Sequence, residues 1–161
     1  MNILTLGHDV LRQKALEVKQ IDGNTVRFVR EMLETMRSGK GIGLAATQVG
    51  VLERIFVVQV EEDIPRVFIN PVLKGVSPEV SSYEEGCLSI PGIYADVKRP
   101  EMISIDAVDE RGKPFHLDAD GLLARVIQHE LDHLNGMLFI DHLSELKRKR
   151  IIRTWEQKFK A

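Results

Sequence analysis

The sequence predicts a small α+β domain. Its middle part reads as a block of strands, and helical patterns flank this block instead of alternating with it. The length of 161 residues is typical of one domain. Hydrophobic residues make up 43% and charged residues 29% of the chain, as in ordinary globular proteins. We therefore expect residues 1–161 to fold as a single domain, and not as a disordered chain or a coiled-coil rod.

The first predicted helix covers residues 25–38. Gly39 follows it as a stop signal, because glycine readily ends a helix. The apolar residues at helical spacing are Val26, Val29, Met32, Leu33 and Met36. A glycine-rich turn over residues 39–43 then leads into Leu44–Gln48.

The middle of the chain is predicted to form strands. Residues 54–60 are rich in β-branched side chains, and residues 66–73 are a second strand. Pro71 predicts an edge position for that strand, because proline cannot donate to the hydrogen-bond ladder. Residues 102–108 alternate in polarity and connect through a turn to residues 114–117, which predicts a hairpin.

Two helices are predicted to close the chain. One covers residues 121–135, with Asp118 and Asp120 as caps before it and Gly136 as its stop. The last helix begins near Ser144. Its apolar side consists of Ile151, Ile152, Trp155 and Phe159.

Charge and cysteine content narrow the partners and the compartment. Lys and Arg total 22 against 24 Asp and Glu, so no overall basic field attracts nucleic acid. The basic run Lys147–Arg150 is interpreted first as a solvated helix face. No apolar run approaches the ~20 residues that span a bilayer, and residues 1–20 lack the apolar core of a signal peptide. We therefore expect no membrane partner. Because Cys87 is the single cysteine and cannot form an internal disulfide, we also expect a cytoplasmic protein.

Residues 128–133 read Gln-His-Glu-Leu-Asp-His and contain the pattern H-E-x-x-H. On a helix, His129 and His133 project from one face about a turn apart, so both rings can bind one metal ion. Glu130 is rotated by about 100° from His129 and can reach a water on that ion without being a ligand. The pattern therefore predicts a metal site with an acid–base carboxylate beside it.

The rest of this helix fits that prediction. At about 100° per residue, Leu122 and Val126 share the face of His129. We place the polar residues on the other side: Arg125, Gln128, Asp132 and Asn135. Glu130 then faces the interior, where an unpaired carboxylate is costly and requires a partner.

A third metal ligand is predicted at Cys87. It lies in the turn-like stretch Tyr83–Gly92, and its thiol would ionise beside a dication. His116 and His142 are the rival donors, although neither has a motif around it. A Cys-His-His set leaves one tetrahedral position open, which is the catalytic arrangement and not the structural one.

Three stretches together resemble the motifs of the peptide deformylase family, in the family's order. They are Gly41–Gln48 (GIGLAATQ), Glu85–Ser89 (EGCLS) and His129–His133 (HELDH). The resemblance implies a single catalytic domain over residues 1–161, with mainly antiparallel strands around a central H-E-x-x-H helix and a C-terminal helix. It implies removal of the formyl group from the N-terminal methionine of newly made polypeptides, with release of formate. Some members act at the ribosome, which would give Lys147–Arg150 a contact.

The resemblance also implies how the reaction is performed. One divalent ion, ferrous iron first and zinc, nickel or cobalt as alternatives, would be held by Cys87, His129 and His133. Metal-bound water would attack the formyl carbon, with Glu130 as general base and then acid. The oxyanion donors implied are the side-chain amide of Gln48 and the backbone N–H of Leu88.

Substrate contacts are expected from the same motifs. An apolar pocket for the methionine side chain is predicted at Ile42, Tyr83, Leu122 and Val126. Gly43 permits close approach of a substrate backbone, and Glu85 is included among the substrate-binding residues. Glu85 or Asp132 is also expected to orient a histidine ring or to pair with Arg99.

Two alternatives differ from this interpretation. A zinc peptidase shares H-E-x-x-H, although a thiolate ligand is unusual in that class. A non-catalytic metal-binding module would need a fourth protein ligand or a dispensable Glu130.

Overall fold

The fold, a computed structural model that describes residues 1–159, combines one sheet, one ribbon and three helices. The antiparallel sheet has the order β1-β2-β3-β6-β7. Its strands are β1 (Gly43–Ala45), β2 (Ile55–Val58), β3 (Arg66–Val76), β6 (Met102–Val108) and β7 (Pro114–Asp120). The antiparallel ribbon and the helices are β4 (Val80–Cys87), β5 (Ile90–Pro100), α1 (Gly23–Ser38), α2 (Gly121–Leu134) and α3 (Glu145–Phe159). Short 3-10 turns lie at Asp9–Arg12, Ala46–Val49 and Phe139–His142. The predicted α+β class is confirmed.

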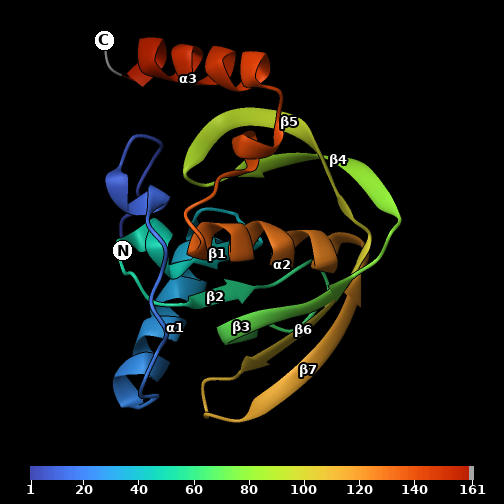
Figure 1. The fold of residues 1–161 in the computed structure, drawn as a ribbon. Coiled ribbons are helices and arrows are strands. Elements are labelled where there is room, and N and C mark those ends of the chain that lie inside the picture. Colours follow the sequence, from blue (N-terminus) through green and yellow to red (C-terminus); the bar gives the residue numbers. More distant parts are fainter. Residues whose placement is uncertain (160–161) are drawn as a thin grey trace.

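Helix α2 lies in the centre, between the five-stranded sheet and the β4–β5 ribbon (Figure 1). The sheet separates it from α1. Both faces of strand β2 are buried, which explains why it is apolar at every position. Phe56 belongs to the hydrophobic cluster beneath α2, whereas Ile55 and Val57 belong to the cluster beneath α1. Residues 124–130 of α2 are all buried, so this helix is covered on its polar side as well.

The predicted helix ends are largely confirmed. The Asp22 side chain accepts from the backbone N–H groups of residues 24 and 25 at the start of α1, and Gly39 follows its end. Asp120 is the residue before α2, but its side chain makes no capping hydrogen bond. Asp118 does not cap α2 either, because it accepts from Ser104 and contacts His116 on the sheet surface.

Two strand predictions are wrong. Strand β3 is not an edge strand, since it pairs with both β2 and β6. Pro71 is tolerated there because the register of β3 shifts between Ile69 and Val72, so that the proline sits in a bulge. The stretch Tyr83–Gly92 is not mainly a turn: it contains the end of β4 and the start of β5, a strand that the pattern did not predict.

The β4–β5 ribbon is an excursion between two strands that pair with each other. Val76 of β3 lies opposite Ile103 of β6. The base of the excursion is closed by backbone hydrogen bonds, from Ser77 N–H to the Met102 carbonyl at 2.9 Å and from Glu101 N–H to the Glu79 carbonyl at 3.0 Å. The ribbon thus projects from a sheet that is continuous without it.

Helix α3 stands beside the ribbon, away from the main sheet (Figure 1). Trp155 is buried and donates from its indole N–H to the Leu6 carbonyl, while Phe159 on the same predicted apolar side is half exposed. None of the described helices is long and apolar enough to cross a membrane.

Replacement of Asn70 by alanine is expected to destabilise the fold. Asn70 has a φ of 52°, and its side chain makes two hydrogen bonds with the backbone of Val18, at 2.8 and 2.9 Å. Two lost bonds of ~1 kcal/mol each and a left-handed alanine at ~1–2 kcal/mol predict a loss of about 3–4 kcal/mol. Urea unfolding of Asn70→Gly, which removes only the bonds, should show a smaller loss. Equal stability of Asn70→Ala and the wild type would contradict this role of the Asn70 side chain and backbone conformation.

Candidate metal centre

The structure brings Cys87, His129 and His133 together. Each offers one ligand atom, and these atoms all lie within 4.8 Å of one another. Cys87 ends strand β4, whereas the two histidines extend from α2, with Cys87 Sγ 3.3 Å from His133 Nε2. The rivals His116 and His142 lie outside this cluster and contact other carboxylates.

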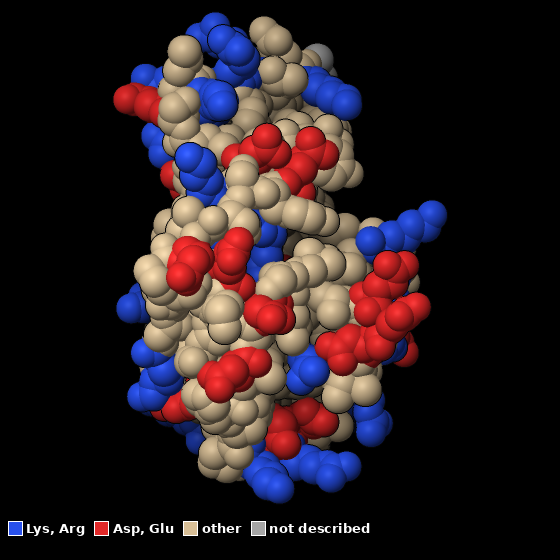
Figure 2. Space-filling view, turned by 90° about the vertical axis from the view of Figure 1, so that its right-hand side faces the viewer, with Lys and Arg blue, Asp and Glu red and all other residues tan. Residues whose placement is uncertain are grey.

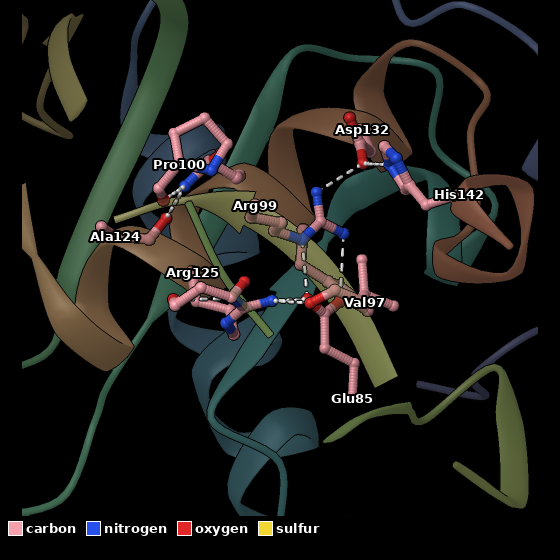
Figure 3. Close-up of polar contacts among 11 residues, drawn as sticks. Glu85, Val97, Arg99, Pro100, Ala124, Arg125, Asp132 and His142 are labelled. Atoms are coloured by element: carbon pink, nitrogen blue, oxygen red, sulfur yellow. Dashed lines mark hydrogen bonds and ion pairs between the residues drawn. The ribbon is translucent and has the colours of Figure 1, made fainter. Parts of the chain in front are cut away.

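The ring of His129 is held by Glu85. Its Nδ1 lies 2.9 Å from Glu85 Oε1, and a carboxylate acceptor requires the proton on Nδ1, which leaves Nε2 free for a metal. Glu85 is buried and also accepts from Arg99 and Arg125 (Figure 3). Burial alone would raise the pKa of Glu85, but the hydrogen bonds from His129 and Arg99 outweigh it and lower the pKa to about 2.

The ion-pair network continues from Arg99 across to α2. Arg99 donates to Asp132 Oδ2 at 2.9 Å, and His142 Nε2 lies 2.7 Å from the same oxygen. Glu85 both orients a histidine and pairs with Arg99, while Asp132 pairs with Arg99. The expected partners of Arg99 are therefore present, and the network ties the ribbon to the metal-binding helix.

The predicted position of Arg125 on the helix is wrong. It does not lie away from His129: a separation of four residues is an offset of only ~40° on a helix, and both side chains reach Glu85. Gln128 is buried too and donates to the carbonyls of Pro100 and Ala124. At Arg125 and Gln128, α2 therefore faces the ribbon and not solvent, whereas Asn135 after its end is exposed. The four-residue spacing was the signal for Arg125.

Glu130 lies beside the cluster and is buried without a polar partner. Among residues 1–159, its Oε1 has no hydrogen-bond partner. Burial raises the pKa of Glu130 to about 7, although the positive charges of His129 and Arg99 oppose the shift. Gly43 of β1 makes room for it, because a Cβ there would meet the Glu130 carboxylate and would lie 2.9 Å from Val126 Cγ1.

Gln48 presents its amide N–H groups to the cluster. Its Oε1 accepts from the backbone N–H of Ala45 at 2.9 Å, which fixes the orientation of the amide. Its Nε2 lies 3.5 Å from Cys87 Sγ and donates to Ser89 Oγ at 3.1 Å. The predicted oxyanion donor is thus fully buried and rigidly held.

A cavity of about 520 Å³ opens beside the cluster. Its wall includes the predicted metal-facing residues Cys87 and His129, together with Glu130. It also includes the remaining predicted residues Ile42, Gly43, Gln48, Tyr83, Glu85, Leu88, Leu122 and Val126. His133 is not among the residues that line this cavity, and its side chain is buried.

The donor set fits a divalent metal ion. A thiolate with two imidazoles suits iron, zinc, nickel or cobalt and leaves a coordination position open. Glu130 lies in the same cavity wall, and its buried Oε1, which has no hydrogen-bond partner within residues 1–159, calls for a polar partner such as water. The pKa of His133 is well below its usual value, because of its burial and the nearby charge of His129, so its ring stays neutral and able to ligate.

Comparisons with known proteins agree with this geometry. A family model described as polypeptide deformylase matches residues 1–149. A peptide deformylase from Agrobacterium fabrum is 48% identical over 163 residues, which cover 99% of this chain and 96% of that protein. One from Cellvibrio japonicus is 52% identical, with coverage of 94% and 90%. The chain belongs to the peptide deformylase family.

Solved structures of the family superimpose closely on this deformylase. The peptide deformylase of Ehrlichia chaffeensis gives a TM-score of 0.95 at 37% identity, with coverage of 98% of this chain and 96% of that one. The enzyme of Synechococcus elongatus, solved with actinonin, gives 0.91 at 45% identity, with coverage of 96% and 86%. The chain is therefore a metallohydrolase that removes the N-terminal formyl group of peptides, and the peptidase and binding-module alternatives are not favoured.

Replacement of Gly43 by alanine should lower deformylase activity. The new methyl group would displace the Glu130 carboxylate, and a misplacement of about 1 Å costs on the order of 10²-fold in rate. Formate release from formyl-Met peptides measures the effect. Gly75→Ala is the control, since no atom lies within 4 Å of its added Cβ. Full activity of Gly43→Ala would mean that Glu130 tolerates the intrusion.

The stability of the metal-free protein should depend on pH through Glu130. Between its ordinary pKa of 4.5 and the raised pKa of about 7, the folded state keeps a proton that the unfolded state loses. The contribution of Glu130 to the free energy of unfolding is therefore expected to fall by about 3 kcal/mol as pH rises through this window, and the difference between the pH profiles of the wild type and Glu130→Gln isolates it. Urea unfolding at several pH values measures it. Glu130→Gln should lack this component, and an identical pH dependence in both proteins would contradict the assignment.

Proposed function

We propose that Cys87, His129 and His133 hold the catalytic metal ion of this deformylase and that Glu130 transfers the protons of the reaction. The supporting observation is the convergence of three ligand atoms within 4.8 Å, with the Glu130 carboxylate buried beside them in the cavity wall. When bound, a divalent ion at these ligands supplies Lewis acidity and lowers the pKa of water.

Glu130 acts as general base and then as general acid. Burial raises the pKa of Glu130 to about 7 in the metal-free protein, which favours a carboxyl group that accepts a proton from the attacking water and later releases it. The unpartnered Oε1 provides the accepting atom. The proton then goes to the leaving amine as the bond to the formyl carbon breaks, which releases formate.

Two donors stabilise the oxyanion that forms on the formyl oxygen. The amide of Gln48 is directed toward Cys87, and the backbone N–H of Leu88 follows that residue in the chain. Preorganised donors of this kind contribute about 10²–10³-fold each to rate. Their attachment next to a metal ligand keeps them in place.

The cavity takes the methionine end of the substrate. Its apolar wall combines Ile42, Leu122 and Val126 with the ring of Tyr83. Gly43 leaves space for the substrate backbone beside Glu130. Glu85 was expected to bind substrate, but its oxygens already accept from His129 and two arginines. We therefore assign it to the orientation of His129.

Residues 1–161 act as one catalytic domain with one ion per chain, ferrous iron in the cell. The thiolate and two imidazoles suit iron as well as zinc, nickel or cobalt, so supply within the cell decides between them. The substrates are formylmethionyl nascent chains, which places the enzyme in the cytoplasm, where such chains are made.

The basic run Lys147–Arg150 provides a contact with the ribosome. Basic side chains gather over α3 at the upper end of the molecule (Figure 2). Lys149 forms an ion pair with Glu145 at 3.0 Å, while Lys147 and Arg150 are exposed. Exposed Lys and Arg side chains favour contacts with RNA phosphates.

Formate release from a formyl-Met dipeptide, by protein purified without oxygen, tests the proposed function. We expect rapid release, about one metal ion per chain and iron as the main metal. Glu130→Gln should keep the metal but lose 10²–10⁴-fold in turnover, because it cannot transfer protons.

Glu53→Gln, an exposed carboxylate outside the cavity, is the matched control and should retain full turnover. A Glu130→Gln enzyme as fast as the wild type would exclude Glu130 as the base. Wild-type release without bound metal would refute the metal site.

A further inference from the structure

Arg125 joins the metal-binding helix to the ribbon that carries Cys87. Its side chain is buried and makes four hydrogen bonds from its two terminal nitrogens. Nη1 donates to Glu85 Oε2 at 2.6 Å and to the Val97 carbonyl at 2.9 Å. Nη2 donates to the Ser81 carbonyl at 2.8 Å and to its hydroxyl at 3.3 Å. One guanidinium therefore reaches β4 and β5 simultaneously.

These contacts follow a single face of β4. Ser81 and Glu85 are hydrogen-bonded to Arg125, and the ring of Tyr83 lies 5.5 Å from the Arg125 guanidinium carbon. Alternate residues of a strand point to the same side, so Arg125 fixes the side of β4 that faces α2. Cys87 ends the strand two residues after Glu85, beyond a shift of the β4–β5 register between these two residues.

The same guanidinium completes the environment of the Glu85 carboxylate. Each oxygen of Glu85 takes two donors: Oε1 from His129 and Arg99, and Oε2 from Arg99 and Arg125. Without Arg125, Oε2 would keep one donor, and the carboxylate that orients His129 would be held less firmly. Both terminal nitrogens of Arg125 are engaged with protein acceptors, so the side chain is not free to bind an anionic substrate group.

We propose that Arg125 is a positioning residue for the metal centre: it holds Glu85, and through it His129, in register with Cys87 on the ribbon. This inference rests on the proposed assignment of Cys87, His129 and His133 as ligands. It adds a residue outside the proposed ligand set, which also forms part of the cavity wall.

Binding of Co²⁺ to the metal-free full-length protein tests the proposal. Visible and near-ultraviolet absorption of bound Co²⁺ reports its geometry and its bond to the Cys87 thiolate. In Arg125→Met, we expect a Co²⁺ dissociation constant 10–100-fold above that of the wild type, as for other partners of metal ligands, together with shifted absorption bands. In Arg125→Lys, an ammonium that reaches Glu85 should recover part of this loss.

Arg54→Met is the matched control. Arg54 is a partly buried arginine that donates to the Leu134 carbonyl at the end of α2 and to the Asn135 side chain that follows it. Its hydrogen bonds involve neither Glu85 nor the ribbon. It should bind Co²⁺ within twofold of the wild type even if its melting temperature falls. Hydrogen exchange of the metal-free proteins gives a second readout, because residues 81–87 should exchange faster in Arg125→Met than in Arg54→Met.

The outcomes separate the two proposals. Wild-type affinity and absorption bands in Arg125→Met, or an equal loss in Arg54→Met, would overturn the positioning role alone. Failure of the wild type to bind Co²⁺ would overturn the ligand assignment and this inference together. If Arg125→Met does not fold, Arg125→Lys decides: a dissociation constant raised at least threefold supports the proposal, and an unchanged one overturns it.

Discussion

The burial of an ionised carboxylate between α2 and the β4–β5 ribbon is the constraint on which the rest of the site depends. Glu85 loses its water on folding, and such a loss is tolerated only when hydrogen bonds and opposite charges replace it. Two arginines and a histidine do so, and each comes from α2 or from β5. The carboxylate therefore determines where the helix and the ribbon can sit relative to each other.

Two glutamates a few ångströms from the same cluster have opposite properties for this reason. Glu85 is surrounded by donors and has a pKa of about 2. Glu130 is equally buried, but its Oε1 has no hydrogen bond from the described residues, and its pKa is about 7. The amino-acid type is the same, so the environment alone separates a permanently charged anchor from a group that can exchange protons near neutrality. Both carboxylates line the same cavity, so the fold creates this difference through the donors that it places around Glu85 alone.

The sequence predicted the parts of the structure that local periodicity determines. The helices, the β6–β7 hairpin and the shared face of His129 and His133 follow from spacings of two or four residues. Pro71 misled because a bulge, which depends on the partner strand, removes the proline from the ladder. Arg125 misled because polarity predicts solvent, whereas its acceptors lie on strands 28 to 44 residues away in the chain. The four-residue spacing from His129 places Arg125 on the right face of α2, but the identity of such long-range acceptors leaves no periodic trace.

The closed base of the ribbon has a consequence for how such a site can change over evolutionary time. Because β3 and β6 pair directly with each other, the sheet does not require residues 77–101 for its continuity. This segment nevertheless supplies the proposed thiolate ligand, the carboxylate of Glu85 and part of the cavity wall. Insertions, deletions or new side chains in the ribbon can therefore remodel the substrate preference, while the histidine pair and the sheet that supports it are inherited unchanged.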